Sequence, residues 1–146
     1  MSATISQQDI EEIGSLCPRL YDSVGWGSGK SPDWDAFRAC CHPSARLVPM
    51  GSGSASPVSV EDFITGMEAQ RESGAVADLR EVELGRAVQA YGNLANVRSA
   101  FLATINGDER RGVTFAHVVR EGGVWVILDA IWENERDGQP LPDALI

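Results

Sequence analysis

The residue best suited to chemistry is Asp129, the single charged residue in the apolar stretch from Val124 to Trp132. A carboxylate in such surroundings costs free energy unless it is paired, hydrogen-bonded or protonated. Burial raises the pKa of a carboxyl, which makes it a usable general acid or base. The structural alternative is a carboxylate hydrogen-bonded to Tyr21, a helix end or a backbone amide. Catalysis would require that Asp129 faces a pocket.

The turns on either side of the strand over 111–121 decide which face each residue occupies. Asn106-Gly107 and Gly122-Gly123 are typical of two-residue hairpin turns. Strand side chains alternate between faces, so this register places one set of candidate site residues together. That pocket-facing set contains Ser99, Phe101, Thr114, Trp125, Asp129 and Ile131. A three-residue loop in either turn would exchange the two faces.

The opposite face of the same strands is broad and apolar, with few polar residues. It carries Arg98, Phe115, His117, Leu128 and Trp132. An uncovered apolar face of this size favours a homodimer formed through it. His117 therefore belongs to the interface in this interpretation, and it should point away from Asp129.

The remaining elements predict an α+β domain that spans residues 1–146. Apolar residues recur at helical spacing over 6–24, Ser31-Pro32-Asp33 starts a second helix, and Ser59 starts a third that ends at Gly74. A short strand over 45–50 is followed by strands over 76–90, 93–105, 111–121 and 124–133. Three helices then cover one face of an antiparallel sheet. Tyr21, Trp26 and Trp34 either line the mouth of a pocket between these layers or belong to the plain core.

Composition excludes several classes of function. The chain has 146 residues and a formal net charge of −9, which disfavours nucleic acid and anionic membranes as partners. No apolar run is long enough to span a bilayer, and the first residues do not resemble a signal peptide. Three cysteines at unsuitable spacings and two separated histidines predict no metal site. We expect reduced cysteines and a cytoplasmic location.

Several segments in order resemble one family, the nuclear transport factor 2-like (NTF2-like) superfamily in its SnoaL-like branch. These segments are Asp33-Trp-Asp-Ala-Phe37 with His42-Pro43, Tyr91-Gly-Asn-Leu-Ala-Asn-Val97, Arg111-Gly112, and Gly122-Gly-Val-Trp-Val-Ile127 through Trp132. The resemblance implies a curved antiparallel sheet wrapped around three helices into a cone with an internal pocket, and frequent homodimers. It also implies that Tyr21 corresponds to the first-helix tyrosine that donates to the oxyanion in steroid isomerases. Ser44 stands where many relatives have an aspartate, so no complete catalytic set carries over.

Two functional hypotheses therefore stay open. In the first, the protein is an enzyme that acts on a small apolar molecule by cofactor-free acid–base chemistry, as an isomerase, dehydratase, cyclase or hydrolase. Asp129 would be its titrating group and Tyr21 a hydrogen-bond donor, while Trp26 and Trp34 would contact the ligand. In the second, the protein is a non-catalytic homodimeric module that binds a ligand or a partner.

Overall fold

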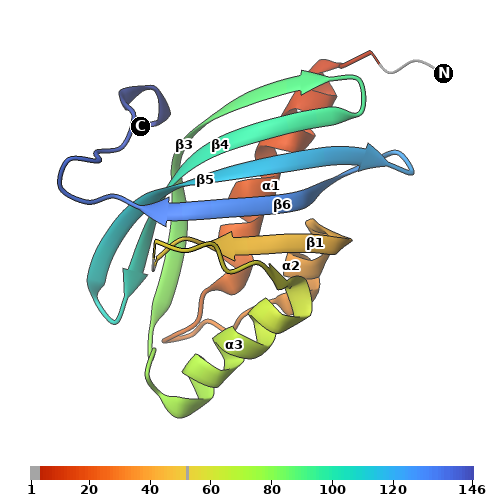
Figure 1. Cartoon of the computed structure of the whole chain (residues 1–146). Coiled ribbons are helices and arrows are strands. Elements are labelled where there is room, and N and C mark those ends of the chain that lie inside the picture. The colour runs from red at the N-terminus through yellow and green to blue at the C-terminus, as the bar shows by residue number, and fades with distance from the viewer. Residues whose placement is uncertain (1–3, 52) are drawn as a thin grey trace.

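A curved six-stranded sheet forms the frame of the protein, as seen in a computed structural model that describes residues 4–51 and 53–146. The strands lie in the order β2 (Val58–Ser59), β1 (Cys41–Pro49), β6 (Val124–Asn134), β5 (Asp108–Glu121), β4 (Leu94–Ile105) and β3 (Leu79–Tyr91). The β1 and β6 strands run parallel, and the other neighbouring pairs are antiparallel. The sheet bends strongly without closing, which confirms the predicted α+β cone (Figure 1).

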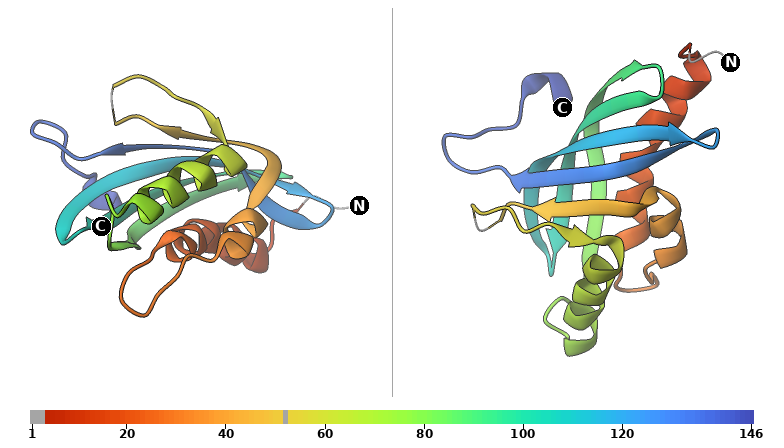
Figure 2. Two further views of the ribbon diagram at one scale, coloured as in Figure 1. Left: turned by 90° about the horizontal axis from the view of Figure 1, so that it is seen from below. Right: turned by 45° about the vertical axis from the view of Figure 1, so that its right-hand side comes forward.

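Three helices lie on the concave side of this sheet (Figure 2). Helix α1 (Gln7–Val24) begins with a capping box, in which Ser6 and Asp9 each accept a hydrogen bond from the other's backbone N–H. Helix α3 (Val60–Ser73) begins at the predicted cap, Ser59, and ends at Gly74. The space between the helices and the sheet is lined mainly by apolar side chains.

The short helix α2 (Trp34–Ala39) begins two residues later than the sequence predicts. The side chain of Asp33, rather than that of Ser31, caps it by accepting a hydrogen bond from the Ala36 N–H at 3.0 Å. The backbone N–H of Asp33 is held by the carbonyl of Ser23 at 2.8 Å, which fixes where the chain turns into the helix. Strand β1 then begins at Cys41, so it includes His42 and Pro43, which were expected to precede it.

Two-residue turns join the strands from β3 to β6, as predicted for Asn106-Gly107 and Gly122-Gly123. Residue pairs that flank the turns lie opposite each other: Tyr91 with Leu94, Ile105 with Asp108, and Glu121 with Val124. At the central turn, Asn106 and Gly107 both have positive φ angles, 51° and 87°, as a type I′ turn requires. Residues from Leu94 to Glu121 therefore lie on the predicted faces.

Two β-bulges lie further along the same sheet, and the sequence did not reveal them. In β3 the extra residue is Leu84, since Glu83 lies opposite Phe101 and Gly85 opposite Ala100. In β6 the extra residue is Leu128, since Ile127 lies opposite Val118 and Asp129 opposite His117. An extra residue reverses the face of every residue beyond it in the strand. Both reversals change which acidic residues face the helices.

The main core lies between α1 and the concave face. Fully buried side chains of Ile13, Leu16 and Cys17 pack there against Val97 and Val118. A second, smaller cluster lies on the convex face, where Leu141 and Leu145 of the C-terminal segment cover Ala100. No helix among the described residues is long and apolar enough to cross a membrane.

Candidate functional site

A pocket of about 210 Å³ lies between the helices and the concave face of the sheet. Most of its lining is apolar and comes from the three helices and from strands of the sheet. The apolar residues include Leu20, Val24, Phe37, Leu47, Phe63, Met67, Phe101 and Trp132. An engineered apolar cavity of about 150 Å³ is large enough to bind benzene. This pocket therefore has room for a molecule of roughly one substituted ring.

Glu81 is the acidic residue in this pocket, and sequence analysis missed it. It lies on β3 opposite Ala103, and the bulge at Leu84 turns its side chain to the concave face. No hydrogen bond or ion pair joins its carboxyl to another residue in the described part of the chain. Burial raises the pKa of Glu81 from its ordinary value of 4.5 to about 7. Part of its surface remains accessible, because Glu81 borders the pocket.

The second acid on this face of β3, Glu83, has a different environment. Its two carboxylate oxygens accept hydrogen bonds from Arg86 Nη1 at 2.6 Å and from Ser99 Oγ at 2.7 Å. An ionised carboxylate with an arginine partner and a hydroxyl donor is a structural group. Glu81 and Glu83 thus lie two residues apart on the same face, one with a charge partner and the other without.

A chain of hydroxyl groups connects Glu83 to the pocket. Ser99 donates to Glu83, the Tyr21 hydroxyl lies 2.9 Å from Ser99 Oγ, and Thr114 Oγ1 lies 3.0 Å from the Tyr21 hydroxyl. Because the Ser99 hydroxyl donates its one hydrogen bond to the carboxylate, it accepts the hydrogen bond of Tyr21. The Tyr21 hydroxyl has only one hydrogen to donate, so in its contact with Thr114 it accepts and Thr114 donates. Burial, followed by the nearby Cys17, raises the pKa of Tyr21. Tyr21 therefore has no proton left for a ligand, whereas Thr114 can rotate its proton toward one.

Several predicted ligand residues do lie at the pocket. Tyr21, Phe101 and Thr114 line it, and Ser99 lies directly behind Tyr21. Trp26 and Trp34 do not line it. Trp26 is buried and donates to the carbonyl of Val76 at 2.9 Å, while Trp34 donates to Glu68 at 3.2 Å and packs edge-on against Phe37.

Asp129 lies on the convex face, so its predicted place in the pocket is wrong. Its carboxylate lies 3.0 Å from Nδ1 of His117, the residue from which it was expected to point away. Ile131 follows it onto the convex face, where 41% of its surface is exposed. Trp132 moves the other way, from the expected interface into the pocket lining. The bulge at Leu128 explains all three reversals, because the turns themselves have the predicted length.

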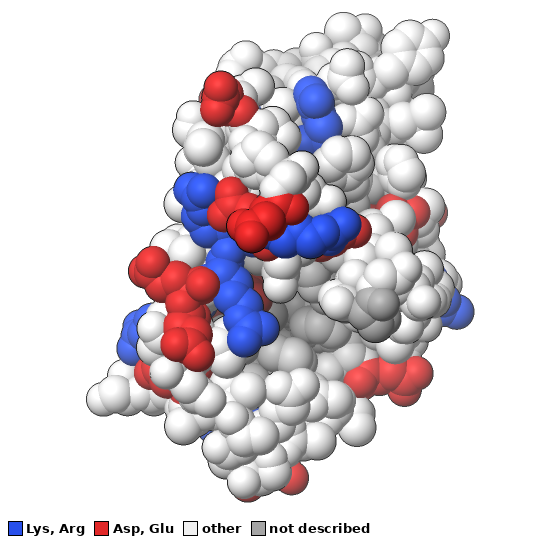
Figure 3. Space-filling model, turned by 60° about the vertical axis from the view of Figure 1, so that its left-hand side comes forward, with Lys and Arg blue, Asp and Glu red and all other residues white. Residues whose placement is uncertain are grey.

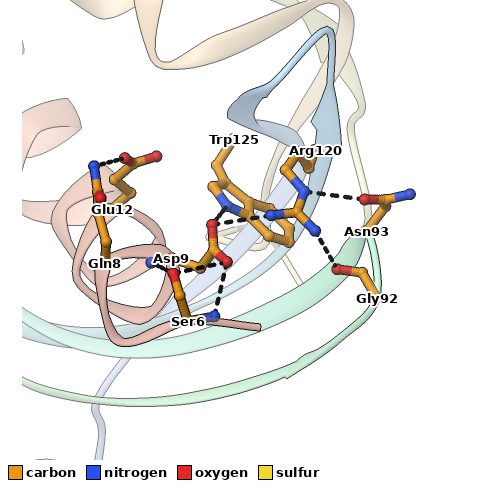
Figure 4. Close-up of polar contacts among 8 residues, drawn as sticks. All are labelled: Ser6, Gln8, Asp9, Glu12, Gly92, Asn93, Arg120 and Trp125. Atoms are coloured by element: carbon orange, nitrogen blue, oxygen red, sulfur yellow. Dashed lines mark hydrogen bonds and ion pairs between the residues drawn. The ribbon is translucent and has the colours of Figure 1, made fainter. Parts of the chain in front are cut away.

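Trp125 is not among the pocket-lining residues and lies beside the first turn of α1, next to Asp9 and Arg120 (Figure 4). Its indole N–H and Nη1 of Arg120 each donate to the same Asp9 oxygen at 3.0 Å. Arg120 also lies over the Trp125 ring at 4.9 Å. The indole hydrogen bond, followed by the Ser6 backbone N–H, lowers the pKa of Asp9 to about 2. This cluster fixes the N-terminus of α1 to the sheet, which makes Trp125 a structural residue.

The open end of the pocket carries two polar residues that sequence analysis did not single out, Arg110 on β5 and Asn134 on β6. Both are exposed as well as lining the pocket, so the pocket reaches the surface beside them. Figure 3 shows the side of the molecule at which β6 ends, with basic and acidic side chains gathered in a band across it. Within the described ranges, no three His, Cys, Asp or Glu side chains lie close enough together to hold a metal ion.

His42 does not belong to the pocket lining. Its Nδ1 accepts the backbone N–H of Ser44 at 3.0 Å, and its Nε2 lies 3.3 Å from Glu121. Ser44 itself is exposed. This part of β1 therefore contributes no polar group to the pocket lining.

Comparison with known proteins supports the fold. The chain is similar to a Kribbella flavida protein (TM-score 0.73, 16% identity, 89% of this chain and 93% of the other). It is also similar to a Nostoc punctiforme protein of unknown function with a cystatin-like fold. That match has a TM-score of 0.70 and 16% identity, and it covers 90% of this chain and 94% of the other. An NTF2-like protein of unknown function from Silicibacter pomeroyi matches as well, with a TM-score of 0.61 and 17% identity. This match covers 90% of this chain and 100% of the other. The chain has the NTF2-like fold.

No protein-family model matches the sequence, and no curated protein matches it. The structural neighbours share less than a fifth of their residues with this chain, so they define its fold rather than its activity.

Proposed function

We propose that the protein binds a small, mainly apolar molecule in this pocket and transfers a proton to or from it through Glu81. The observation that carries the proposal is an unpaired carboxyl in an apolar pocket. A group with a pKa near 7 is present in both protonation states at neutral pH, which suits general acid–base catalysis. The role that sequence analysis gave to Asp129 thus passes to Glu81.

The chemistry needs no group beyond the pocket residues. As a base, the Glu81 carboxylate takes a proton from a carbon next to a carbonyl, which leaves an enolate and a neutral Glu81. As an acid, the neutral carboxyl returns that proton to the same carbon or to another one. Thr114, which lies 3.0 Å from the Tyr21 hydroxyl, can turn its hydroxyl hydrogen from Tyr21 to the substrate oxygen. Isomerisation consists of these two steps. Dehydration follows when the neutral Glu81 instead gives the proton to a hydroxyl group on the neighbouring carbon, which leaves as water while the electron pair of the enolate forms the carbon–carbon double bond.

Hydrogen exchange into a small ketone tests the proposal directly. Cyclohexanone in D2O exchanges its α-protons slowly, and proton NMR follows the loss of signal. We expect the protein to accelerate exchange with a midpoint near pH 7, and Glu81→Gln to abolish the acceleration. Glu72→Gln, which removes an exposed carboxylate on α3, is the matched control.

Two results would count against this function. One is exchange at the buffer rate with wild-type protein. The other is a Glu81 carboxyl that titrates at its ordinary pH in a carbon-13 NMR titration, with the resonance assigned by its loss in Glu81→Gln. Saturable binding without exchange would favour the non-catalytic ligand-binding module instead.

We also propose that the convex face forms a homodimer. Large apolar side chains are exposed there, with Phe115 at 58%, Leu128 at 37% and Ile131 at 41% of their surface. Arg98 and the pair of His117 with Asp129 add polar groups to this face. A patch of this kind on a sheet is typical of an isologous interface. Trp132 is no longer part of it.

We further propose a cytoplasmic location, supported by the cysteines. Cys17, Cys40 and Cys41 are free and buried. Burial raises the pKa of the Cys17 thiol and that of the Cys41 thiol to about 12, so both remain protonated. Unreactive buried thiols without a disulfide fit a reducing compartment.

A further inference from the structure

Arg110 is a cation at the pocket mouth that has no acidic partner. Neighbouring arginines are paired: Arg111 with Glu135 at 2.8 Å, and Arg136 with Glu133 at 2.8 Å. For Arg110, no ion pair or side-chain hydrogen bond is formed with any residue that the structure describes. In a chain with a net charge of −9, a pocket arginine without an acid beside it is a free binding group.

Asn134 provides a second free donor next to Arg110. It lies opposite Gly112 on the neighbouring strand, so it is a diagonal neighbour of Arg110 on the same face. Diagonal neighbours in a sheet lie about 7–8 Å apart, within the reach of an arginine side chain. The side-chain amide of Asn134 makes no hydrogen bond within residues 4–51 and 53–146. The two donors can therefore converge on one ligand group.

Charge and shape favour a carboxylate as that group. The planar guanidinium of arginine matches the two oxygens of a carboxylate, and a single cation balances a single negative charge. The rest of the pocket lining is mainly apolar, with room for about one ring. We propose that Arg110 and Asn134 bind the carboxylate of a small apolar acid, such as an aryl carboxylate. This inference rests on the proposed function, in which Glu81 of the same pocket transfers a proton to or from the bound molecule.

The position of Glu81 fits this orientation. Glu81, Ala103 and Arg110 lie on one rung across β3, β4 and β5. Adjacent strands are about 4.8 Å apart, so the backbones of Glu81 and Arg110 are separated by about 10 Å. An acid bound at Arg110 thus places its carboxylate at the mouth, while Glu81 meets a different part of the molecule. Glu81 is expected to act on a carbon remote from the carboxylate.

Binding of benzoate, with benzamide as the neutral probe of equal shape, tests this inference. Calorimetry on wild-type protein at pH 7.5 should give benzoate the lower Kd. A hydrogen-bonded charge pair is worth about 1.5–3 kcal/mol, so Arg110→Gln should weaken benzoate about tenfold or more. Benzamide should change less than about twofold. Arg19→Gln, which removes an exposed arginine of α1 outside the pocket lining, should change neither Kd.

The outcomes separate this inference from the proposed function. Benzoate that binds no tighter than benzamide, or no saturable benzoate binding, would overturn the anion site. So would an Arg110→Gln variant that weakens both probes equally. If the benzoate preference depends on Arg110 but ketone exchange does not depend on Glu81, then the anion site stands and the proton-transfer function fails. If ketone exchange depends on Glu81 but the benzoate preference does not depend on Arg110, then the proton-transfer function stands and the anion site fails.

Discussion

Replacing Glu81 with glutamine should stabilise the protein, and by an amount that depends on pH. Glutamine keeps the shape of the side chain but cannot ionise. The pKa of Glu81 is about 7 in the folded protein against 4.5 for the ordinary group, so the folded state holds its proton more tightly than the unfolded state does. Above pH 7 the wild type must bury a charge, whereas Glu81→Gln does not.

The size of this effect follows from the difference between the two pKa values. Each pKa unit corresponds to about 1.4 kcal/mol, so the change from 4.5 to about 7 amounts to about 3 kcal/mol. The side chain keeps some contact with solvent through the pocket, which reduces the expected effect to about 2 kcal/mol. The folded state binds more protons between pH 4.5 and 7, so wild-type stability falls as the pH rises through this window.

Urea unfolding at pH 4.5 and pH 8 measures this difference. Wild type and Glu81→Gln should have similar free energies of unfolding at pH 4.5, and the variant should be more stable at pH 8. Glu72→Gln controls for the loss of one negative charge from the whole molecule. Equal pH dependence in wild type and Glu81→Gln would refute the reasoning, because it would mean that Glu81 is as well solvated as an ordinary carboxyl.

Three further substitutions test other parts of the structure. Phe115→Glu should convert a dimer to a monomer in sedimentation velocity with little change in unfolding, and a wild type already monomeric at micromolar concentration would contradict the interface. Asp129→Asn should leave ketone exchange intact. It should change the free energy of unfolding by only about 0.5 kcal/mol, because its partner His117 is 71% exposed and an exposed ion pair contributes little. Loss of exchange in this variant would return the catalytic role to Asp129. Gly112→Ala should lower the free energy of unfolding by about 2 kcal/mol in urea titrations, because the added carbon would clash with the backbone carbonyl of Glu133 and lie 2.5 Å from the Phe101 ring. Unchanged stability would show that the β6 backbone and the ring both move aside freely.

The sequence predicts the order of elements and the turns because local residues specify them. Asn106-Gly107 adopts the positive φ angles of its turn, and Ser59 caps the helix that follows it. These features depend on a few adjacent residues and on backbone geometry. They also place Ser99, Phe101 and Thr114 on the concave face, where the structure has them.

The candidate acid could not be predicted in the same way. Glu81 and Glu83 alternate with Val82 and Leu84, which indicates that the two acids share a face without indicating which one. Alternating acids ordinarily face water. In this sheet the apolar residues face outward instead, with Val82 exposed to 52%. The pairing of β3 with β4 decides which β3 residues face the helices. Counting residue pairs back from the turn at Gly92 gives this pairing correctly only as far as the bulge at Leu84.

The two bulges connect the shape of the fold to the chemistry of its pocket. A bulge increases the bend and twist of a strand, which a sheet needs in order to wrap around helices. It also reverses the side chains beyond it, so curvature and side-chain placement change together. In β3 this reversal brings Glu81 to the concave face, and in β6 it takes Asp129 to the convex face beside His117. A strictly alternating reading selects the wrong acid for this reason, and the bends that enclose the pocket also decide which carboxyl occupies it.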